Sequence, residues 1–359
     1  MSLPTLQSEL ERAYRGRRVL VTGHTGFKGG WLAAWLADLG AEVAGYALPP
    51  PTEPNLFTAA GIGDRVRHAE GDVRDLDRFA AVWRAADPEV VFHLAAQPLV
   101  RESYRDPVGT LSTNVLGTAH ALEIARRQPP RAMVVVTSDK CYENREWPWP
   151  YRESDALGGH DIYSASKAAA ELITDSFRRS FFQNPFVPVA TARAGNVIGG
   201  GDWAANRIVP DAVRALAAGE PVRVRNPRAV RPWQHVLEPL SGYLLLGARL
   251  LEAQAPDLCS AWNFGPDPSS SGSVADLVET LIAAWGAGFW EADGGPPGGH
   301  EAGLLRLAID KAAAGLGWAP RWGFPEAIRH TADWYRAFYG GEDMASWCRR
   351  QIHSYLETR

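Results

Sequence analysis

A glycine-rich loop set directly between a buried strand and a helix is the feature that most limits how this chain can fold. Arg18–Thr22 (RVLVT) is short, rich in β-branched residues and uncharged after its first residue, which predicts a buried parallel strand. Glycines recur through 23–30, and apolar residues at helical spacing then continue to Gly40, which closes the helix. The order strand, loop, helix predicts the opening unit of an α/β fold.

The same alternation recurs through the first half of the chain. Short apolar runs predict strands at Glu42–Tyr46, Val66–Glu70, Val90–Leu94, Met133–Thr137 and Val189–Arg193. Helical spacing falls between them at Leu76–Ala86, Thr113–Arg127 and Tyr163–Phe182. Short strands that alternate with longer helices predict a doubly wound parallel sheet of the Rossmann type.

The pattern changes after about Arg193. Helical segments follow at Val209–Ala218, Leu237–Glu252 and Val274–Trp285, and Gly286–Gly303 is expected to be an exposed loop. We therefore assign residues 1–193 to the Rossmann domain, with 1–16 as an N-terminal extension. Residues 194–359 are expected to form mainly a smaller C-terminal α/β lobe that binds substrate, with some segments returning to the first domain.

Composition excludes several classes of partner. The net charge is −4 and there is no basic run, so we expect no nucleic-acid binding. The apolar stretches are shorter than the ~18 residues that a membrane helix needs, so we expect no membrane partner. Three cysteines cannot build a disulfide framework, which favours a reducing, cytoplasmic location.

The loop Gly23–Gly29 (GHTGFKG) has the composition of a phosphate-binding turn. Glycines let backbone amides at a helix N-terminus approach a pyrophosphate, although any tight turn also uses glycine. The next strand ends in Ala44-Gly45-Tyr46-Ala47 without an acidic ribose ligand, which leaves NAD and NADP open. Asp72 and Val73 could border an adenine; alternatively, Asp72 caps a helix.

Two further groups of residues could carry acid–base chemistry. Among 37 basic residues the lysines are only Lys28, Lys140, Lys167 and Lys311. Lys167 follows Tyr163 by one helical turn, where an ammonium could lower the pKa of a phenol toward neutrality. Ser138-Asp139-Lys140 ends a predicted central strand, where ligands bind in open parallel sheets. The alternatives are an ordinary amphipathic helix and a surface ion pair.

Taken in order, these elements resemble the extended short-chain dehydrogenase/reductase family, which comprises NAD-dependent epimerases and dehydratases. His93–Gln97 (HLAAQ) and Thr113–Thr118 (TNVLGT) match motifs of that family. A narrower resemblance, to its CDP-glucose 4,6-dehydratase branch, spans about residues 15 to 335. It is carried by GHTGFKGGWL, TSDKCYENREW, YRESDALGGHDIYSASKAAAE, RAGNVIGGGDWAANRIVPD and RPWQHVLEPLSGYL.

The resemblance implies tightly bound NAD and no metal. The implied cofactor-binding residues are Gly23, Thr25, Gly26, Phe27, Lys28, Gly29, Asp72, Val73, Leu94, Ala95, Ala96, Gln97, Thr113, Tyr163 and Lys167. The implied hydro-lyase reaction converts CDP-D-glucose to CDP-4-keto-6-deoxy-D-glucose. It proceeds by transient oxidation at C4, elimination of water across C5 and C6, and hydride return to C6, as in dideoxysugar and O-antigen biosynthesis.

The resemblance also implies a role for each catalytic residue. Tyr163 takes the proton of the sugar 4-hydroxyl, and Lys167 lowers the pKa of Tyr163 and holds the nicotinamide ribose. Ser138 binds the 4-oxygen, and Asp139 protonates the departing 6-hydroxyl. Most 4,6-dehydratases carry Glu at the position of Lys140, whereas the CDP-glucose branch carries Lys, which is expected to remove the C5 proton. The implied substrate-binding residues are Ser138, Asn196, Arg207, Arg231 and His235.

Three other functions remain open. A 4,6-dehydratase of another nucleotide-hexose would use the same residues, and a nucleotide-sugar 4-epimerase would need Tyr163 and Lys167 but no elimination acid. An NAD-binding sensor would need only the glycine loop. The resemblance further implies a homodimer formed by the helices Thr113–Arg127 and Tyr163–Phe182.

Overall fold

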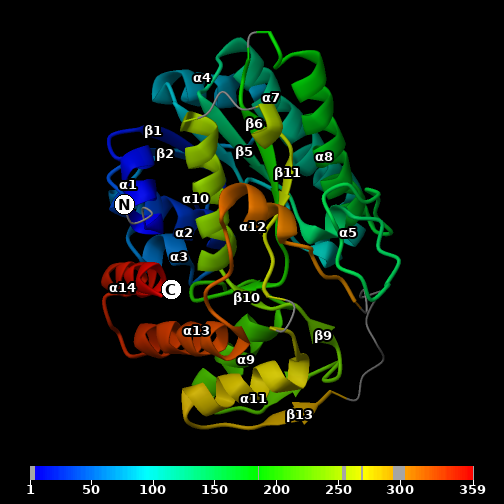
Figure 1. Ribbon diagram of the computed structural model, residues 1–359. Helices are drawn as coiled ribbons and strands as arrows, with labels where there is room; N and C mark the ends of the chain where they lie inside the picture. Colours follow the sequence, from blue (N-terminus) through cyan, green and yellow to red (C-terminus); the bar gives the residue numbers. More distant parts are fainter. Residues whose placement is uncertain (1–4, 185, 253–255, 268–269, 294–303, 359) are drawn as a thin grey trace.

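A parallel sheet forms the centre of the molecule (Figure 1). The computed structural model describes residues 5–184, 186–252, 256–267, 270–293 and 304–358. Within them the sheet has seven strands in the order β11-β6-β5-β4-β1-β2-β3, all paired in parallel. Their bounds are β1 (Arg18–Thr22), β2 (Glu42–Ala47), β3 (Arg67–Glu70), β4 (Val90–His93), β5 (Ala132–Val136), β6 (Val189–Arg193) and β11 (Ala261–Asn263). The predicted doubly wound α/β class is confirmed.

Helices cover both faces of the sheet, which is why its central strands read as continuous apolar runs. One face carries α1 (Leu6–Tyr14), α2 (Phe27–Asp38), α10 (Leu237–Glu252) and α12 (Asp310–Leu316). The other carries α4 (Leu76–Ala86), α7 (Gly117–Arg127) and α8 (Ile162–Ser180). Each face has its own hydrophobic core.

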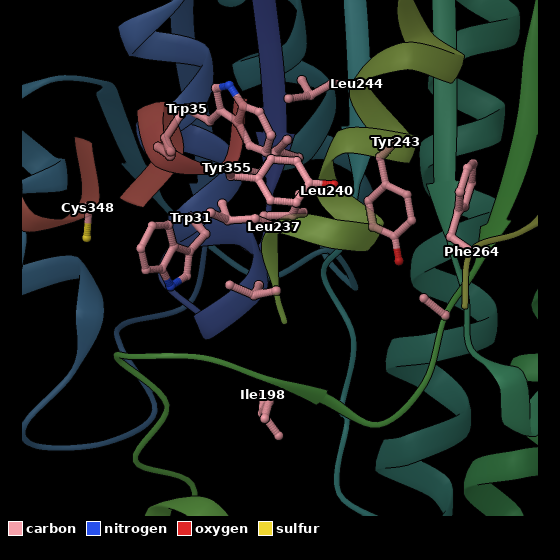
Figure 2. Close-up of a cluster of buried hydrophobic side chains, with 14 of the residues drawn as sticks. Trp31, Trp35, Ile198, Leu237, Leu240, Tyr243, Leu244, Phe264, Cys348 and Tyr355 are labelled. Carbon is pink, nitrogen blue, oxygen red and sulfur yellow. The ribbon is translucent and has the colours of Figure 1, made fainter. Parts of the chain in front are cut away.

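Figure 2 shows part of the larger core, between α2, α10 and the C-terminal helix α14 (Met344–Glu357). Trp31 and Trp35 lie one turn apart on α2 and are fully buried. The Trp35 ring meets Tyr355 of α14 edge-on, with ring centroids 5.8 Å apart. The end of the chain thus packs onto α2, the helix that follows the glycine loop.

A smaller group of elements lies below the sheet in Figure 1. It contains α9 (Ile208–Ala218), α11 (Val274–Trp285), α13 (Phe324–Tyr339) and the strand pairs β7 (Val197–Ile198) with β10 (Gln234–His235), β8 (Val222–Val224) with β13 (Trp290–Ala292), and β9 (Val230–Arg231) with β12 (Gly272–Ser273). The expected loop Gly286–Gly303 therefore includes a strand, because Trp290–Ala292 pairs with β8. Positions 294–303 lie outside the described residues.

The helix expected at Thr113–Arg127 begins earlier and is irregular. The short helices α3 (Leu56–Ala59), α5 (Val100–Arg105) and α6 (Pro107–Leu111) precede α7, and Ser112–Leu116 forms a π-helical turn between α6 and α7. Pro107 occupies the first turn of α6, where its missing N–H costs nothing. None of the described helices is long and apolar enough to cross a membrane.

Candidate active site

The sequence-predicted site residues gather where β1, β4 and β5 end. The sheet order reverses between β1 and β4, and parallel sheets bind ligands at such a reversal. The glycine loop follows β1, Leu94–Gln97 follows β4, and Ser138–Lys140 follows β5. The fold therefore brings three separate sequence motifs to one edge of the sheet.

The glycine loop is shaped by two positions that accept no side chain. Gly23 has φ +76°, and a Cβ there would lie 2.9 Å from the Ala95 nitrogen of the neighbouring loop. A Cβ on Gly29 would lie 2.1 Å from the Gly23 carbonyl oxygen. Backbone thus packs on backbone, and only glycine permits this approach.

The N-terminus of α2 fits the diphosphate of a dinucleotide. Gly26 precedes the helix, no side chain caps it, and its first turn holds no acidic residue. Free amides and the positive end of the helix dipole therefore meet the glycine loop at a point suited to an anion. Thr25 lies beside them and donates to the Leu48 carbonyl at 2.8 Å.

The loop after β4 is held by a residue that sequence reasoning did not select. The Asn114 amide oxygen accepts from the Gln97 N–H at 2.8 Å, and its nitrogen donates to Ser166 Oγ on α8 at 2.9 Å. Asn114 lies in the π-helical turn, next to the selected Thr113. It links the cofactor loop to the helix that carries Tyr163 and Lys167, and its signal in the sequence is its place in the TNVLGT motif.

Asp72 and Val73 follow β3, but the helix-cap alternative for Asp72 is wrong. Asp75 caps α4 by accepting from the Arg78 N–H at 3.0 Å. Asp72 instead pairs with Arg74, whose hydrogen bond to the carboxylate lowers the pKa of Asp72. Val73 is buried in the core beneath the sheet.

Ser138 and Asp139 are buried at the end of β5 and hydrogen-bonded to each other. The Ser138 hydroxyl donates to Asp139 Oδ1 at 2.9 Å and accepts from the Lys140 N–H at 3.2 Å. Asn196 donates to Asp139 Oδ2 at 3.5 Å. A Cβ on Gly195 would come within 1.9 Å of the Asp139 carboxylate, so that glycine makes room for the acid. Lys140 is half-buried beside them.

Asp161 sets the position of Tyr163 by capping α8, accepting from the Ser164 N–H at 2.9 Å. Burial raises the pKa of Tyr163 to about 12, while a hydrogen bond with Ser138 acts in the opposite direction. The net shift of the Tyr163 pKa is therefore upward, whereas the sequence predicted a shift toward neutrality. Burial also lowers the pKa of Lys167 to about 8, and the charges that act on it are those of Cys141 and Glu171.

Two further basic residues converge on this group. Burial lowers the pKa of Lys28 to about 8, opposed by the charge of Asp139 and reinforced by Lys167 and Arg207. Arg207 precedes α9 and pairs with Asp202 at 2.8 Å. The Lys28 ammonium is therefore close enough to feel the charges of Asp139 and, from the smaller lobe, of Arg207.

The other two predicted substrate residues lie on short strands of the smaller lobe. Arg231 lies on β9, where it pairs with Gly272 of β12 and donates to the Val230 carbonyl. His235 is fully buried between the rings of Trp31 and Trp322, and burial holds its pKa well below the ordinary value. His235 is thus a core residue, because the smaller lobe meets α2 at this point.

The fold and the site define a dinucleotide-binding α/β protein with a serine, an acid, a tyrosine and a lysine at the nucleotide end of its sheet. Residues 19–260 match the sequence model of the NAD dependent epimerase/dehydratase family. A CDP-glucose 4,6-dehydratase of Salmonella typhimurium is 47% identical over 354 residues, which cover 96% of this chain and 98% of that protein. The chain belongs to the NAD dependent epimerase/dehydratase family.

More distant relatives carry the same fold. A dTDP-glucose 4,6-dehydratase of Streptomyces antibioticus is 31% identical over 333 residues, covering 89% of this chain and 92% of that protein. The structure of a dTDP-glucose 4,6-dehydratase from Bacillus anthracis in complex with NAD matches with a TM-score of 0.74 and 21% identity. That match covers 89% of this chain and 96% of the other. The glycine loop and the uncapped α2 fit this cofactor.

Proposed function

We propose that the protein is a hydro-lyase that converts CDP-D-glucose to CDP-4-keto-6-deoxy-D-glucose with tightly bound NAD. The observation that carries the proposal is the buried Asp139, hydrogen-bonded to Ser138, which in turn bonds Tyr163. The Ser138 hydroxyl thus contacts both Tyr163, the base for C4 oxidation, and Asp139, the acid for elimination. The 47% identity to a CDP-glucose 4,6-dehydratase supports the choice of nucleotide.

The residues divide the proton transfers among them. Tyr163 takes the proton of the 4-hydroxyl in its phenolate form, which burial disfavours and the positive charge of the bound cofactor would favour, and Ser138 holds the 4-oxygen. When bound, NAD supplies reversible hydride acceptance. The resulting ketone acidifies the C5 proton, which Lys140 removes, and Asp139 protonates the departing 6-hydroxyl so that it leaves as water. Gly23–Gly29 and Leu94–Gln97 would hold the cofactor, with Lys167 at its ribose.

The acid distinguishes this proposal from a 4-epimerase. Epimerisation at C4 needs the tyrosine and the cofactor but no proton donor for a leaving hydroxyl. Asp139 is 4% exposed, and burying a carboxyl costs free energy. Its presence in the site therefore indicates a function in the reaction. Asp139 as the acid and Lys140 as the C5 base therefore favour elimination.

The test is to incubate the purified protein with CDP-glucose and catalytic NAD and to follow the 4-keto-sugar absorbance in alkali. UDP-, dTDP- and GDP-glucose run in parallel. We expect a signal from CDP-glucose without net NADH. A signal from another nucleotide alone would retain the chemistry and reject the CDP assignment. If NAD binds and all four substrates give no keto-sugar, the dehydratase proposal is wrong.

We also propose a cytoplasmic homodimer that pairs through the α7–α8 side of the molecule. Large apolar side chains are exposed on α8 and on the α5, α6 and π-turn segments that pack beside it: Tyr104, Val108, Leu111, Leu116 and Leu172. Exposed apolar groups that gather on neighbouring helices favour burial against a second copy. Sedimentation at micromolar concentration is expected to give a dimer, and a monomer would contradict the pairing.

A further inference from the structure

Tyr243 is a buried phenol whose polar atom has no function in the packing. It projects from α10 and is 0% exposed, with its ring edge-on to Phe264 at a centroid distance of 5.6 Å. Figure 2 shows the ring between Leu240 and Phe264, with the hydroxyl at the end farthest from the helix. No residue in the described part of the chain hydrogen-bonds this hydroxyl.

An unpaired buried hydroxyl costs roughly 10-fold or more in folding equilibrium relative to a paired one, so its presence needs a reason. The neighbouring phenol Tyr14, equally buried, donates to the Leu244 carbonyl of the same helix at 2.6 Å. Phenylalanine would fill the Tyr243 site without leaving a donor unsatisfied. Packing alone therefore does not account for the tyrosine.

The electrostatic neighbours of Tyr243 are catalytic groups. After burial, the charges of Asp139 and then Tyr163 raise the pKa of the Tyr243 phenol. The phenol therefore keeps its proton and remains a donor. Helix α10 packs against β5 and β6, the strands whose ends lead to Asp139 and Gly195. Phe264, which the Tyr243 ring meets edge-on, and Gly195, which adjoins the Asp139 carboxylate, are joined through one Gln234 amide group, so the phenol and the acid lie in the same buried region.

Asp139 has capacity for another donor. Its Oδ1 accepts one bond, from Ser138, and its Oδ2 meets Asn196 only at 3.5 Å. A carboxylate can accept about four hydrogen bonds. When Asp139 loses its proton in a buried site, the carboxylate that forms can accept more hydrogen bonds than Ser138 and Asn196 donate to it.

We propose that Tyr243 is a positioning residue that donates a hydrogen bond to Asp139 as that carboxyl gives up its proton to the leaving 6-oxygen. In this step the C5 proton passes to Lys140, and the electron pair of the C5–H bond forms the C5–C6 double bond. The C6–O bond breaks, and the departing oxygen takes the proton of the Asp139 O–H bond and leaves as water. Tyr243 keeps its own proton throughout. The Tyr243 hydroxyl has no acceptor before the step and donates to the Asp139 carboxylate after it. A hydrogen bond that forms only as charge develops stabilises the transition state more than the ground state. The inference rests on the proposed dehydratase function.

Gln234 is the alternative hydrogen-bond partner to consider for the Tyr243 hydroxyl. It is 1% exposed, and its amide nitrogen donates to the Gly195 and Phe264 carbonyls. Its amide oxygen has no hydrogen-bond partner among the described residues. A buried water shared by Gln234 and Tyr243 would make the phenol a purely structural group.

The test is the variant Tyr243→Phe in the NAD-loaded enzyme, followed through one turnover of CDP-glucose by the near-ultraviolet absorbance of reduced nicotinamide. We expect the rise of that absorbance, which reports C4 oxidation, to be unchanged. Its decay, which requires elimination, is expected to slow by about tenfold or more, with KM unchanged. Tyr14→Phe is the matched control and is expected to leave both phases as in the wild type.

Thermal unfolding distinguishes a structural role of the Tyr243 hydroxyl from a role in positioning Asp139. Tyr14→Phe loses a hydrogen bond that exists and is expected to lower the midpoint, whereas Tyr243→Phe is expected to leave it unchanged or raise it. Unchanged kinetic phases, or a lowered midpoint with both phases slowed, would overturn the inference. A wild-type enzyme that forms no keto-sugar would instead overturn the proposed function and this step with it, so the two failures are distinguishable.

Discussion

At the scale of single residues, the site depends on polar groups that are buried next to one another. Ser138, Asp139, Tyr163 and Lys167 are each less than a tenth exposed. Burial raises the pKa of Tyr163 and lowers that of Lys167, so both are driven toward their neutral forms. The proposed oxidation at C4 therefore needs the Tyr163 phenol to lose its proton before it can act as a base.

Asp139→Asn is expected to stop the reaction after C4 oxidation. Asparagine keeps the acceptor for Ser138 but cannot protonate the 6-hydroxyl, so reduced nicotinamide should accumulate while keto-sugar formation falls by about 10²- to 10⁴-fold. Rapid-scan absorbance after mixing with CDP-glucose measures both. Asp77→Asn, on the exposed surface of α4, is the control. Equal loss of both steps would show that Asp139 is not the elimination acid.

Sequence reasoning found the residues of the site that lie in local motifs. Ser138, Asp139, Tyr163 and Lys28 are brought together as expected, because each follows a strand or begins a helix at one sheet edge. Contacts set by distant packing could not be predicted. His235 is a core residue because α2 meets the smaller lobe, and the role of Asn114 depends on partners 17 and 52 positions away.

At the scale of elements, the pattern of apolar residues predicted the bounds of several strands and helices. Arg18–Thr22, Leu76–Ala86 and Leu237–Glu252 have the predicted limits. The helices α1, α13 and α14 were not assigned, although each has an apolar face that packs on the core. The π turn before α7 could not be predicted, since remote hydrogen bonds to Asn114 accompany it.

Gly29→Ala is expected to disrupt the glycine loop. The added Cβ would lie 2.1 Å from the Gly23 oxygen, so the backbone must shift where amides meet the diphosphate. NAD binding, measured by titration calorimetry, should weaken by at least about tenfold, and stability should fall by about 1–3 kcal/mol. Gly323→Ala is the control, because a Cβ there meets nothing closer than 3.8 Å. Wild-type affinity in Gly29→Ala would rule out the proposed role of the loop.

At the scale of the whole molecule, the end of the chain is tied to the sheet domain through a buried carboxyl. Glu238 begins α10 and accepts from the Trp322 N–H and from the Tyr355 hydroxyl, each at 2.7 Å. Arg321 in turn donates to carbonyls at the end of α14. Burial raises the pKa of Glu238 to about 7 despite these donors.

This linkage predicts a pH-dependent stability. The pKa of Glu238 is higher in the folded than in the unfolded chain, so its contribution is fully present below about pH 4.5 and is lost as pH rises through about 7. Glu238→Gln does not titrate and should gain up to about 3 kcal/mol relative to wild type over that range. Denaturant unfolding at both ends of the range measures it.

Glu220→Gln, at an exposed position after α9, is the control and should follow the wild type at every pH. A constant difference between Glu238→Gln and wild type would show that Glu238 does not titrate in this range.

The central claim is that one hydride leaves C4 and returns to C6 of the same sugar. Tyr163 takes the proton of the 4-hydroxyl, and Asp139 gives a proton to the departing 6-hydroxyl. The most direct measurement uses CDP-glucose deuterated at C4 and locates the label in the product by NMR. We predict that the deuterium appears at C6 and that no net reduced cofactor forms. Deuterium retained at C4, or lost from the product, would contradict the account.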